Sequence, residues 1–313
     1  MTRLEFSHSG IYAAALTPLN ADLSPDEDAL VRHGRWLLDN GCDGLAVLGT
    51  TGEANSFSVS ERMSMIEAMV EGGVPVSSLM PGTGCCSISD TVELTRHALG
   101  LGVTGALMLP PFYYKGVSDD GLFAAYAQVI DRIDDDRLRL YLYHFPQMSS
   151  VPLSYDLIAR LIEAYPGIIA GMKDSSGEFT NMSGASERFP GFAVFSGSDE
   201  FLLDILNAGG AGCITAVSNI ASSLATRVLR AWRDGEADNA TDLQEKLTTV
   251  RETVCAYPLS AALKEIMARH SGDGEWRNIR PPLQALDDAG AADLLARLAD
   301  TGFSLPALNG GVR

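Results

Sequence analysis

Positively charged residues are scarce in this sequence. Of its 313 residues, 23 are lysine or arginine and 40 are aspartate or glutamate, which gives a formal net charge of −17 at pH 7. A surface with this charge repels phosphate groups, so we expect neither nucleic acid nor an anionic membrane as a partner. It also repels small anions, so a site for an anionic substrate must supply its own local positive potential.

Cysteine is also rare, and the five cysteines form neither a regular framework nor a CxxC motif. The adjacent Cys85 and Cys86 are typical of reduced thiols in a cytosolic protein. The first ten residues contain no apolar stretch, so we expect no signal peptide. Residues 205–226 lack charges but contain three glycines and two asparagines, which favours a buried strand and loop over a membrane span. The sequence therefore predicts a soluble, cytoplasmic protein.

Several common catalytic motifs are missing. No GxGxxG follows the first predicted strand, and neither GxxxxGK[S/T] nor GxSxG is present, so a nucleotide site and a nucleophile-elbow serine are not predicted. The five histidines are scattered and lack the spacing of metal ligands. We therefore expect neither a cofactor nor a metal ion.

Short apolar segments recur along the chain, bounded by glycine or proline, as is typical of parallel strands covered by helices. Helical periodicity lies between them, for example at residues 25–40, 60–71, 89–101 and 119–133. Eight such units favour a (β/α)8 barrel, the TIM-barrel fold, over an open sheet. The expected strands are residues 11–17, 44–48, 75–80, 104–109, 138–143, 167–172, 192–196 and 212–216.

We expect residues 1–220 to form the α/β barrel and residues 221–313 to form a C-terminal helical extension packed on it. The extension contains helical patterns at residues 236–250 and 259–270, and no flexible linker precedes it, which favours a single domain. At the start of the first helix, Ser24 is the expected N-cap and precedes a proline.

Polar and aromatic residues gather where the predicted strands end, on the face where barrel enzymes build their active sites. Lys173 ends an apolar run, so we expect its amino group at the inner rim. Burial disfavours the ammonium form of lysine, and a neutral amine attacks ketones. The alternative is a lysine that extends to the surface. The segments concerned are residues 49–53, 110–115, 143–146, 173–177, 197–200 and 215–219.

Two further positions suit the same chemistry. Tyr143 ends a strand and can shuttle a proton, although a core tyrosine is the commoner outcome. Thr50 and Thr51 lie in a glycine-flanked turn that we expect to open a helix, whose N-terminus can hold a carboxylate. In the simpler interpretation this turn only joins a strand to a helix, and Glu53 serves the first helical turn electrostatically.

Four segments in this order resemble the dihydrodipicolinate synthase / N-acetylneuraminate lyase family of pyruvate-dependent Schiff-base aldolases. The resemblance covers residues 11–230 and extends into the helical tail. The segments are GTTGE at 49–53, PPFYY at 110–114, YHFP at 143–146 and GMKDSSG at 171–177.

The resemblance implies that Lys173 forms a Schiff base with pyruvate and that Tyr143 is the general acid/base. Thr50 and Tyr113 would complete a proton relay, with Tyr113 reaching into a neighbouring subunit of a dimer or tetramer. The partners implied are pyruvate, an aldehyde and further copies of this chain. The substrate-binding residues implied are Thr51, Ile214, Ser175, Gly197, Asp199 and Glu200.

Two positions depart from the family pattern. The resemblance implies an arginine at the position of Met148 in the synthases, where it binds the carboxylate of aspartate semialdehyde. It implies a serine at the position of Ala216 in the sialic acid lyases. An apolar thioether cannot replace a guanidinium. We therefore predict reversible cleavage of a 2-keto-3-deoxy sugar acid, or a similar 2-keto acid, to pyruvate and an aldehyde. The alternatives are 4-hydroxy-tetrahydrodipicolinate (dihydrodipicolinate) synthase, a 2-keto acid dehydratase, and a non-catalytic keto-acid-binding protein.

Overall fold

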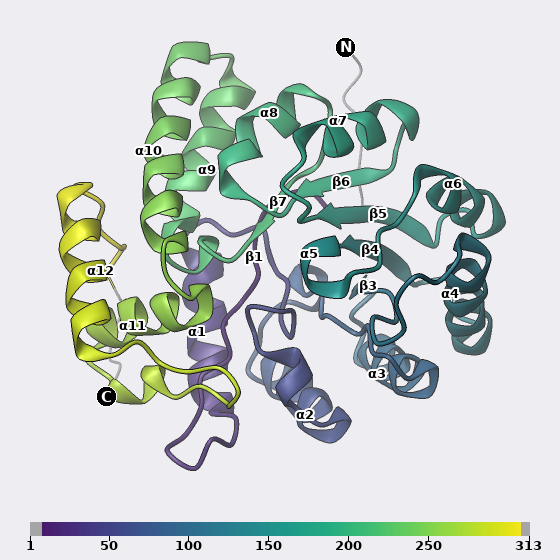
Figure 1. Ribbon diagram of the computed structural model, residues 1–313, viewed down its shortest axis with the longest axis horizontal. Helices are drawn as coiled ribbons and strands as arrows, with labels where there is room; N and C mark the ends of the chain where they lie inside the picture. Colours follow the sequence, from purple (N-terminus) through teal and green to yellow (C-terminus); the bar gives the residue numbers. More distant parts are fainter. Residues whose placement is uncertain (1–7, 308–313) are drawn as a thin grey trace.

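A computed structural model describes residues 8–307 of the protein. Within them, seven parallel strands form one curved sheet at the centre of the molecule, in the order β2-β1-β7-β6-β5-β4-β3 (Figure 1). The strands are β1 (Gly10–Ala13), β2 (Gly44–Leu45), β3 (Gly105–Met108), β4 (Arg139–His144), β5 (Ile169–Asp174), β6 (Ala193–Ser196) and β7 (Gly212–Thr215).

Residues 79–82 close this sheet into a barrel. Leu79 forms a parallel bridge with Leu45 of β2, and Gly82 forms one with Leu107 of β3. The two edge strands are therefore joined through a segment that takes the eighth strand position, and the fold is the α/β barrel expected from the sequence.

The predicted strand at residues 75–80 is wrong in its bounds. Val76–Ser78 form the 3-10 turn η2, and strand-like pairing begins only at Leu79. Pro75 lacks an N–H group for a ladder, and its carbonyl accepts a hydrogen bond from the Ser78 hydroxyl at 2.7 Å. Each of the other seven predicted strands overlaps an observed one.

Alternate strand residues face the barrel interior and the surrounding helices. On β5, Met172 packs outward, whereas a Cβ on Gly171 would lie 2.8 Å from the ring of Tyr141, so Gly171 faces inward. Lys173, two residues after Gly171, has the same inward direction. The apolar interior is formed by Tyr12, Ala14, Ala46, Met80, Leu107, Tyr141, Tyr143, Ala193, Phe195, Ala211 and Ile214.

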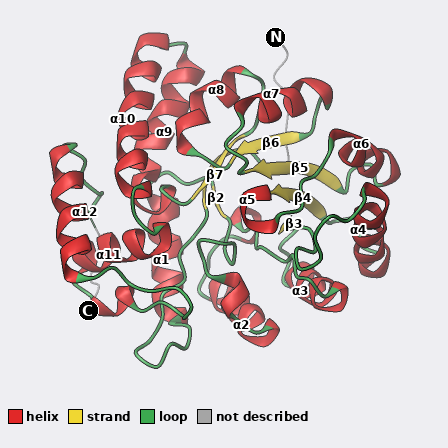
Figure 2. Cartoon of the chain, viewed as in Figure 1, coloured by secondary structure: helices red, strands yellow, loops and turns green. Residues whose placement is uncertain are grey.

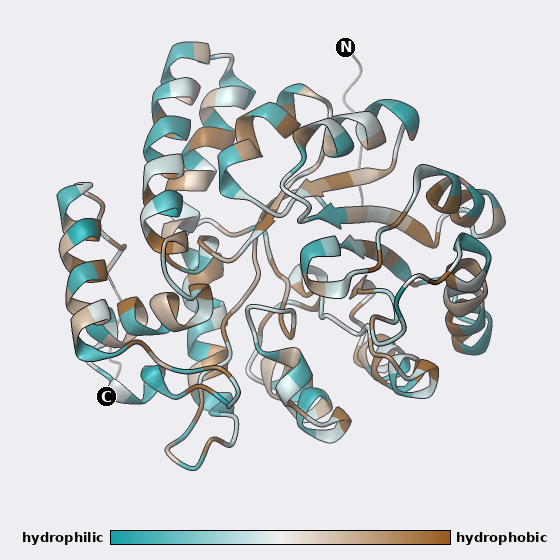
Figure 3. Cartoon of the chain, viewed as in Figure 1, coloured by the Kyte–Doolittle hydropathy of each residue, from teal (hydrophilic) through white to brown (hydrophobic). Residues whose placement is uncertain are grey.

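Helices surround the sheet, with their apolar sides turned toward it (Figures 2 and 3). Four of them begin after a serine whose side chain accepts a backbone N–H of the first turn, at Ser58, Ser87, Ser118 and Ser154. These helices are α1 (Glu27–Asp39), α2 (Val59–Glu71), α3 (Ile88–Gly100), α4 (Asp119–Ile133), α5 (Pro146–Ser149), α6 (Tyr155–Ala164), α7 (Phe179–Arg188), α8 (Leu202–Asn207) and α9 (Ser218–Asp234).

The prediction of Ser24 as the first N-cap is wrong. Helix α1 begins at Glu27, and the Asp26 carboxylate accepts the N–H of Ala29 at 2.9 Å. Ser24 instead donates its hydroxyl hydrogen to Asp22 at 2.6 Å, within the preceding turn. Its side chain is therefore engaged before the helix starts.

Three more helices follow α9 and lie on one side of the barrel, namely α10 (Ala237–Cys255), α11 (Leu259–Ser271) and α12 (Asp288–Asp300) (Figure 1). Their buried residues join Ile11 and Leu16 in one apolar cluster. Within residues 8–307, every helix is too short or too polar to cross a lipid bilayer.

A buried ion pair joins the loop after β2 to these C-terminal helices. Lys264 of α11 is 1% exposed and contacts the carboxylate of Glu53, which also accepts the N–H of Arg280 at 2.9 Å. Burial lowers the pKa of Lys264, and the neighbouring Glu53 opposes that shift. The interpretation of Glu53 as a first-turn residue of a helix is therefore wrong, because its carboxylate is bound by the C-terminal region.

This ion pair generates a stability prediction. Lys264→Met should lower the free energy of unfolding by about 3–5 kcal/mol, because it leaves the Glu53 charge buried without its partner. The double variant Glu53→Gln/Lys264→Met should recover most of that loss. Urea denaturation measures both. Arg160→Ala, which breaks an exposed ion pair with Asp120, is the control and should change stability little; an equally small effect of Lys264→Met contradicts the prediction.

Candidate active site

Lys173 and Tyr143, which we call the inner pair, are direct neighbours on β5 and β4. The amino group of Lys173 donates a hydrogen bond to the Tyr143 hydroxyl at 3.2 Å and lies 4.4 Å from the centre of its ring. Each residue is 5% exposed. The barrel thus holds an amine beside a phenol, which is an arrangement that can combine nucleophilic attack with proton transfer.

Asp174 fixes the end of β5 immediately after Lys173. Its side chain is fully buried and accepts two hydrogen bonds, from the Ser176 N–H at 2.8 Å and from the Asn181 amide at 2.6 Å. Because both carboxylate oxygens are engaged behind the strand, the backbone that carries the lysine is held in place. Sequence reasoning did not single out this role, although the DSS segment that follows the lysine is a turn signal.

His144 does the same for β4. Its Nδ1 accepts the N–H of Leu153 at 3.1 Å, so this nitrogen carries no proton. Burial lowers the pKa of His144, and the neighbouring Asp174 carboxylate opposes that shift. The neutral imidazole therefore holds the end of β4, directly after Tyr143.

Ser175 and Gly197 pack against one another beside the inner pair. The Ser175 N–H donates to the His144 carbonyl at 2.8 Å, whereas its buried hydroxyl has no partner within residues 8–307. A Cβ on Gly197 would lie 2.1 Å from that hydroxyl oxygen. Gly197 is therefore required for the position of Ser175.

Asp199 and Glu200 lie in the 3-10 turn η3 (Asp199–Phe201) that follows β6, and both carboxylates have protein partners. Asp199 is buried and accepts the Thr215 hydroxyl at 2.6 Å; burial raises its pKa. Glu200 accepts the Ser198 hydroxyl at 3.0 Å and lies 3.7 Å from Arg251 of α10. That these two residues bind a hydroxylated chain stays a prediction.

Thr50 and Thr51 lie in the turn after β2, as expected, with Thr50 exposed and Thr51 buried. The expectation that this turn opens a helix is wrong. Glu53 adopts a left-handed conformation, the 3-10 turn η1 (Ala54–Ser56) follows, and α2 begins only after Ser58. A full helix terminus is therefore not available to a carboxylate at the two threonines.

Tyr113 and Ile214 lie in contrasting environments. Tyr113 is 73% exposed and packs edge-to-face on Tyr114, which is equally exposed. Ile214 is fully buried in the same interior cluster as Tyr143. Ile214 therefore shares the interior cluster with Tyr143, whereas Tyr113 is a surface residue of the single chain.

Met148 lies on the short helix α5 and is 59% exposed. The neighbouring Ser149 carbonyl accepts a hydrogen bond from the amino group of Lys115 at 2.8 Å. A cation therefore stands close to the helix that lacks the arginine. Within residues 8–307, no cluster of three or more histidine, cysteine, aspartate or glutamate side chains can hold a metal ion.

The chain belongs to the dihydrodipicolinate synthetase family, whose profile matches residues 7–300. It is 35% identical over 288 residues to an uncharacterized DapA-like lyase of Chloroflexus aurantiacus, covering 92% of this chain and 95% of that one. It is 31% identical over 299 residues to the 4-hydroxy-tetrahydrodipicolinate synthase of Methanothrix thermoacetophila, covering 93% and 97%.

Among solved structures, the chain is similar to YagE from E. coli, a prophage protein of the same family crystallised with pyruvate. The two share 27% identity and a TM-score of 0.86, over 94% of this chain and 98% of that one. Members of this family are lyases, and so is this protein.

The contact between Gly197 and Ser175 generates a second prediction. Gly197→Ala should lower the free energy of unfolding by about 1–3 kcal/mol, because the added methyl group meets the Ser175 side chain and the Asp174 carbonyl. Gly100→Ala is the matched control, since a Cβ there has nothing within 4 Å, and should be neutral or slightly stabilising. Urea denaturation compares the two variants, and equal midpoints would show that the glycine at 197 is not constrained.

Proposed function

We propose that the protein is a Schiff-base-forming, pyruvate-dependent aldolase that reversibly cleaves a 2-keto-3-deoxy sugar acid, or a similar 2-keto acid, to pyruvate and an aldehyde. The observation that carries this proposal is the 3.2 Å contact between the Lys173 amine and the Tyr143 hydroxyl inside the barrel. The pyruvate held by YagE supports the choice of keto acid.

In the proposed cleavage, the Lys173 amine attacks the 2-keto carbon, and the resulting carbinolamine loses water with Tyr143 as the proton shuttle. The iminium then withdraws electrons while the C3–C4 bond breaks, and Tyr143 accepts the proton of the C4 hydroxyl as the aldehyde forms. The pyruvate enamine takes up a proton at C3, and water hydrolyses the imine. Thr50 and Tyr113 connect the tyrosine to solvent in this scheme.

The same proposal assigns the pyruvate half of the site. Thr51, in the glycine-flanked turn, binds the carboxylate, and the backbone at Ile214 lines the methyl group. Ser175 supports the other half, because its hydroxyl has no hydrogen-bond partner within residues 8–307. We assign Gly197, Asp199 and Glu200 to the same distal half.

We also propose that the enzyme works in the cytoplasm as a homo-oligomer, a dimer or tetramer. The exposed, mutually packed Tyr113 and Tyr114 support an interface at this point. In that assembly Tyr113 reaches the site of a neighbouring subunit. Residues 1–220 and 221–313 are proposed as barrel and helical extension of a single domain, which is supported by their shared apolar cluster.

A second candidate is 4-hydroxy-tetrahydrodipicolinate synthase, the name of several relatives. One observation favours it: Lys115 stands beside the carbonyl of Ser149, next to Met148. An ammonium at this point can hold the carboxylate of aspartate semialdehyde without an arginine. However, it lacks the paired donors of a guanidinium, so we rank this candidate second.

The covalent step is tested by trapping. Borohydride with pyruvate should inactivate the protein and add one reduced pyruvate per chain at Lys173, because borohydride reduces an imine to a stable amine. Lys173→Ala should abolish both effects, whereas Lys246→Ala, which removes an exposed lysine of α10, is the control and should leave both unchanged. Peptide mass spectrometry locates the adduct; its attachment at another lysine would rule out the assignment.

The choice of aldehyde is tested by comparing acceptors in the condensation direction. We expect kcat/KM for aspartate semialdehyde to be at least about a hundredfold below that for the best hydroxyaldehyde, or roughly 2.7 kcal/mol, because its carboxylate lacks a guanidinium. Met148→Arg should raise activity with aspartate semialdehyde. If that aldehyde is the best acceptor and Lys115→Met removes the activity, the synthase is the correct candidate.

A further inference from the structure

The loop of residues 82–86 packs between the loops that follow β2 and β3, on the face that carries the inner pair. A Cβ on Gly82 would lie 2.3 Å from the Leu48 carbonyl oxygen, and one on Gly84 would lie 2.4 Å from that of Leu109. Both contacts are made at the start of loops that carry proposed site residues. The conformation of this loop therefore constrains its two neighbours.

Arg62 of α2 binds this loop through two hydrogen bonds. It is 3% exposed, and its guanidinium donates to the Gly82 carbonyl at 2.7 Å and to the Cys85 sulfur at 3.1 Å, while its Nε is buried without a partner. Within residues 8–307, no carboxylate lies within 4.0 Å of this guanidinium.

A buried guanidinium stays charged, and burying it without a counter-ion is costly. Of the two groups that accept hydrogen bonds from Arg62 in the described chain, the Gly82 carbonyl cannot ionise and the Cys85 sulfur can. A thiolate at Cys85 would neutralise the buried charge. Arginine beside a cysteine is also an environment that activates thiols.

We propose that Cys85 is a modification site: hydroperoxides oxidise its sulfur, which the Arg62 guanidinium contacts at 3.1 Å. Cys85 is half-buried, so a small peroxide can reach it. Its N–H donates to the Thr91 hydroxyl at 3.0 Å, which fixes the backbone of the loop at this residue.

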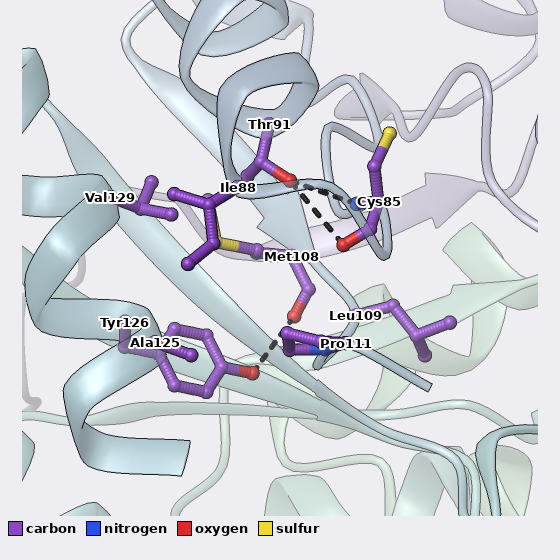
Figure 4. Close-up of a pocket in the computed structure, with 9 residues that line it drawn as sticks. All are labelled: Cys85, Ile88, Thr91, Met108, Leu109, Pro111, Ala125, Tyr126 and Val129. Atoms are coloured by element: carbon purple, nitrogen blue, oxygen red, sulfur yellow. Dashed lines mark hydrogen bonds between the residues drawn. The ribbon is translucent and has the colours of Figure 1, made fainter. Parts of the chain in front are cut away.

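The groups around the Cys85 sulfur are compatible with its oxidation (Figure 4). Cys85 borders a small pocket between α3, α4 and β3, but its sulfur points away from the apolar Ile88 and Val129. The titratable group on the α4 side is Tyr126, whose hydroxyl donates to the Met108 carbonyl at 3.4 Å; burial raises its pKa, so it stays neutral. Arg62 is the charged group that contacts the sulfur, at 3.1 Å.

In the oxidation, the thiolate sulfur attacks one oxygen of the hydroperoxide, and the S–O bond forms as the O–O bond breaks. The sulfur loses two electrons and becomes a sulfenic acid, and the leaving oxygen takes a proton from solvent, which gives water from hydrogen peroxide. The product is uncharged, so Arg62 loses its counter-ion and its contact with the loop of residues 82–86 is weakened.

The chain supplies its own matched control. Arg251 donates to the sulfur of Cys255 at 3.0 Å, and Cys255 is more exposed than Cys85, but this arginine already has the Glu200 carboxylate at 3.7 Å. Burial raises the pKa of the Cys255 thiol. The exposed Cys86 is a second control for accessibility.

The test is alkylation of the native protein with iodoacetamide, followed by peptide mass spectrometry. Cys85 should react at about pH 7 at least about tenfold faster than Cys86 and Cys255. With hydrogen peroxide and dimedone, the sulfenic acid adduct should form at Cys85. Alkylation of Cys85 no faster than of the two controls overturns the proposal.

Variants of Arg62 test whether this residue causes the fast alkylation of Cys85. Arg62→Met should reduce the alkylation rate of Cys85 to that of Cys86, and Arg62→Lys, which keeps a cation, should restore part of it. An unchanged rate in a folded Arg62→Met protein also overturns the proposal. If that variant does not fold, the wild-type comparison of Cys85 with Cys86 and Cys255 decides alone. None of these measurements uses pyruvate, so their outcome is independent of the proposed aldolase activity.

Discussion

The contact between Lys173 and Tyr143 depends on one structural constraint, the parallel register of β4 and β5. These strands align Tyr143 with Lys173 and His144 with Asp174, so one pair faces the interior and the next pair faces the helices. A slip of β5 by one residue would turn Lys173 toward the helices and Asp174 toward the interior. The buried partners of His144 and Asp174 hold the register, because both side chains are hydrogen-bonded behind the sheet.

The loops of the same face are held from the C-terminal helices. Lys264 of α11 binds Glu53 in the loop after β2, and Gln244 of α10 donates to the carbonyls of Asp199 and Glu200 after β6. Arg280 binds Glu61 and lowers the pKa of that carboxyl to about 2. A barrel strand therefore positions each reactive group, while helices outside the barrel position the loops around it.

Much of this arrangement could be predicted from the sequence because it is written in local patterns. Apolar runs bounded by glycine and proline located seven strands, and the lysine at the end of one run pointed to the inner rim. The eighth strand position was misplaced because its pairing depends on neighbours far along the chain, Leu45 and Leu107. The same limit applies to Glu53, whose partner Lys264 lies 211 residues away and is invisible to any local pattern.

The remaining roles needed more than local patterns. The four motif segments indicated the family, and the family profile confirmed it. They did not indicate that Arg62 lacks a carboxylate partner within residues 8–307 or that Gly197 accommodates Ser175, since both facts arise from packing between separate elements. Such contacts follow from the closed barrel, which brings the ends of all strands together.

The central claim is that Lys173 is the nucleophile and that Tyr143 transfers the protons of its reaction. The most direct measurement is a crystal structure of the protein soaked with pyruvate. Our account predicts continuous electron density from the Nζ of Lys173 to C2 of pyruvate, with the Tyr143 hydroxyl within hydrogen-bonding distance of the adduct. Pyruvate bound without a covalent link, or linked to a different lysine, would contradict it.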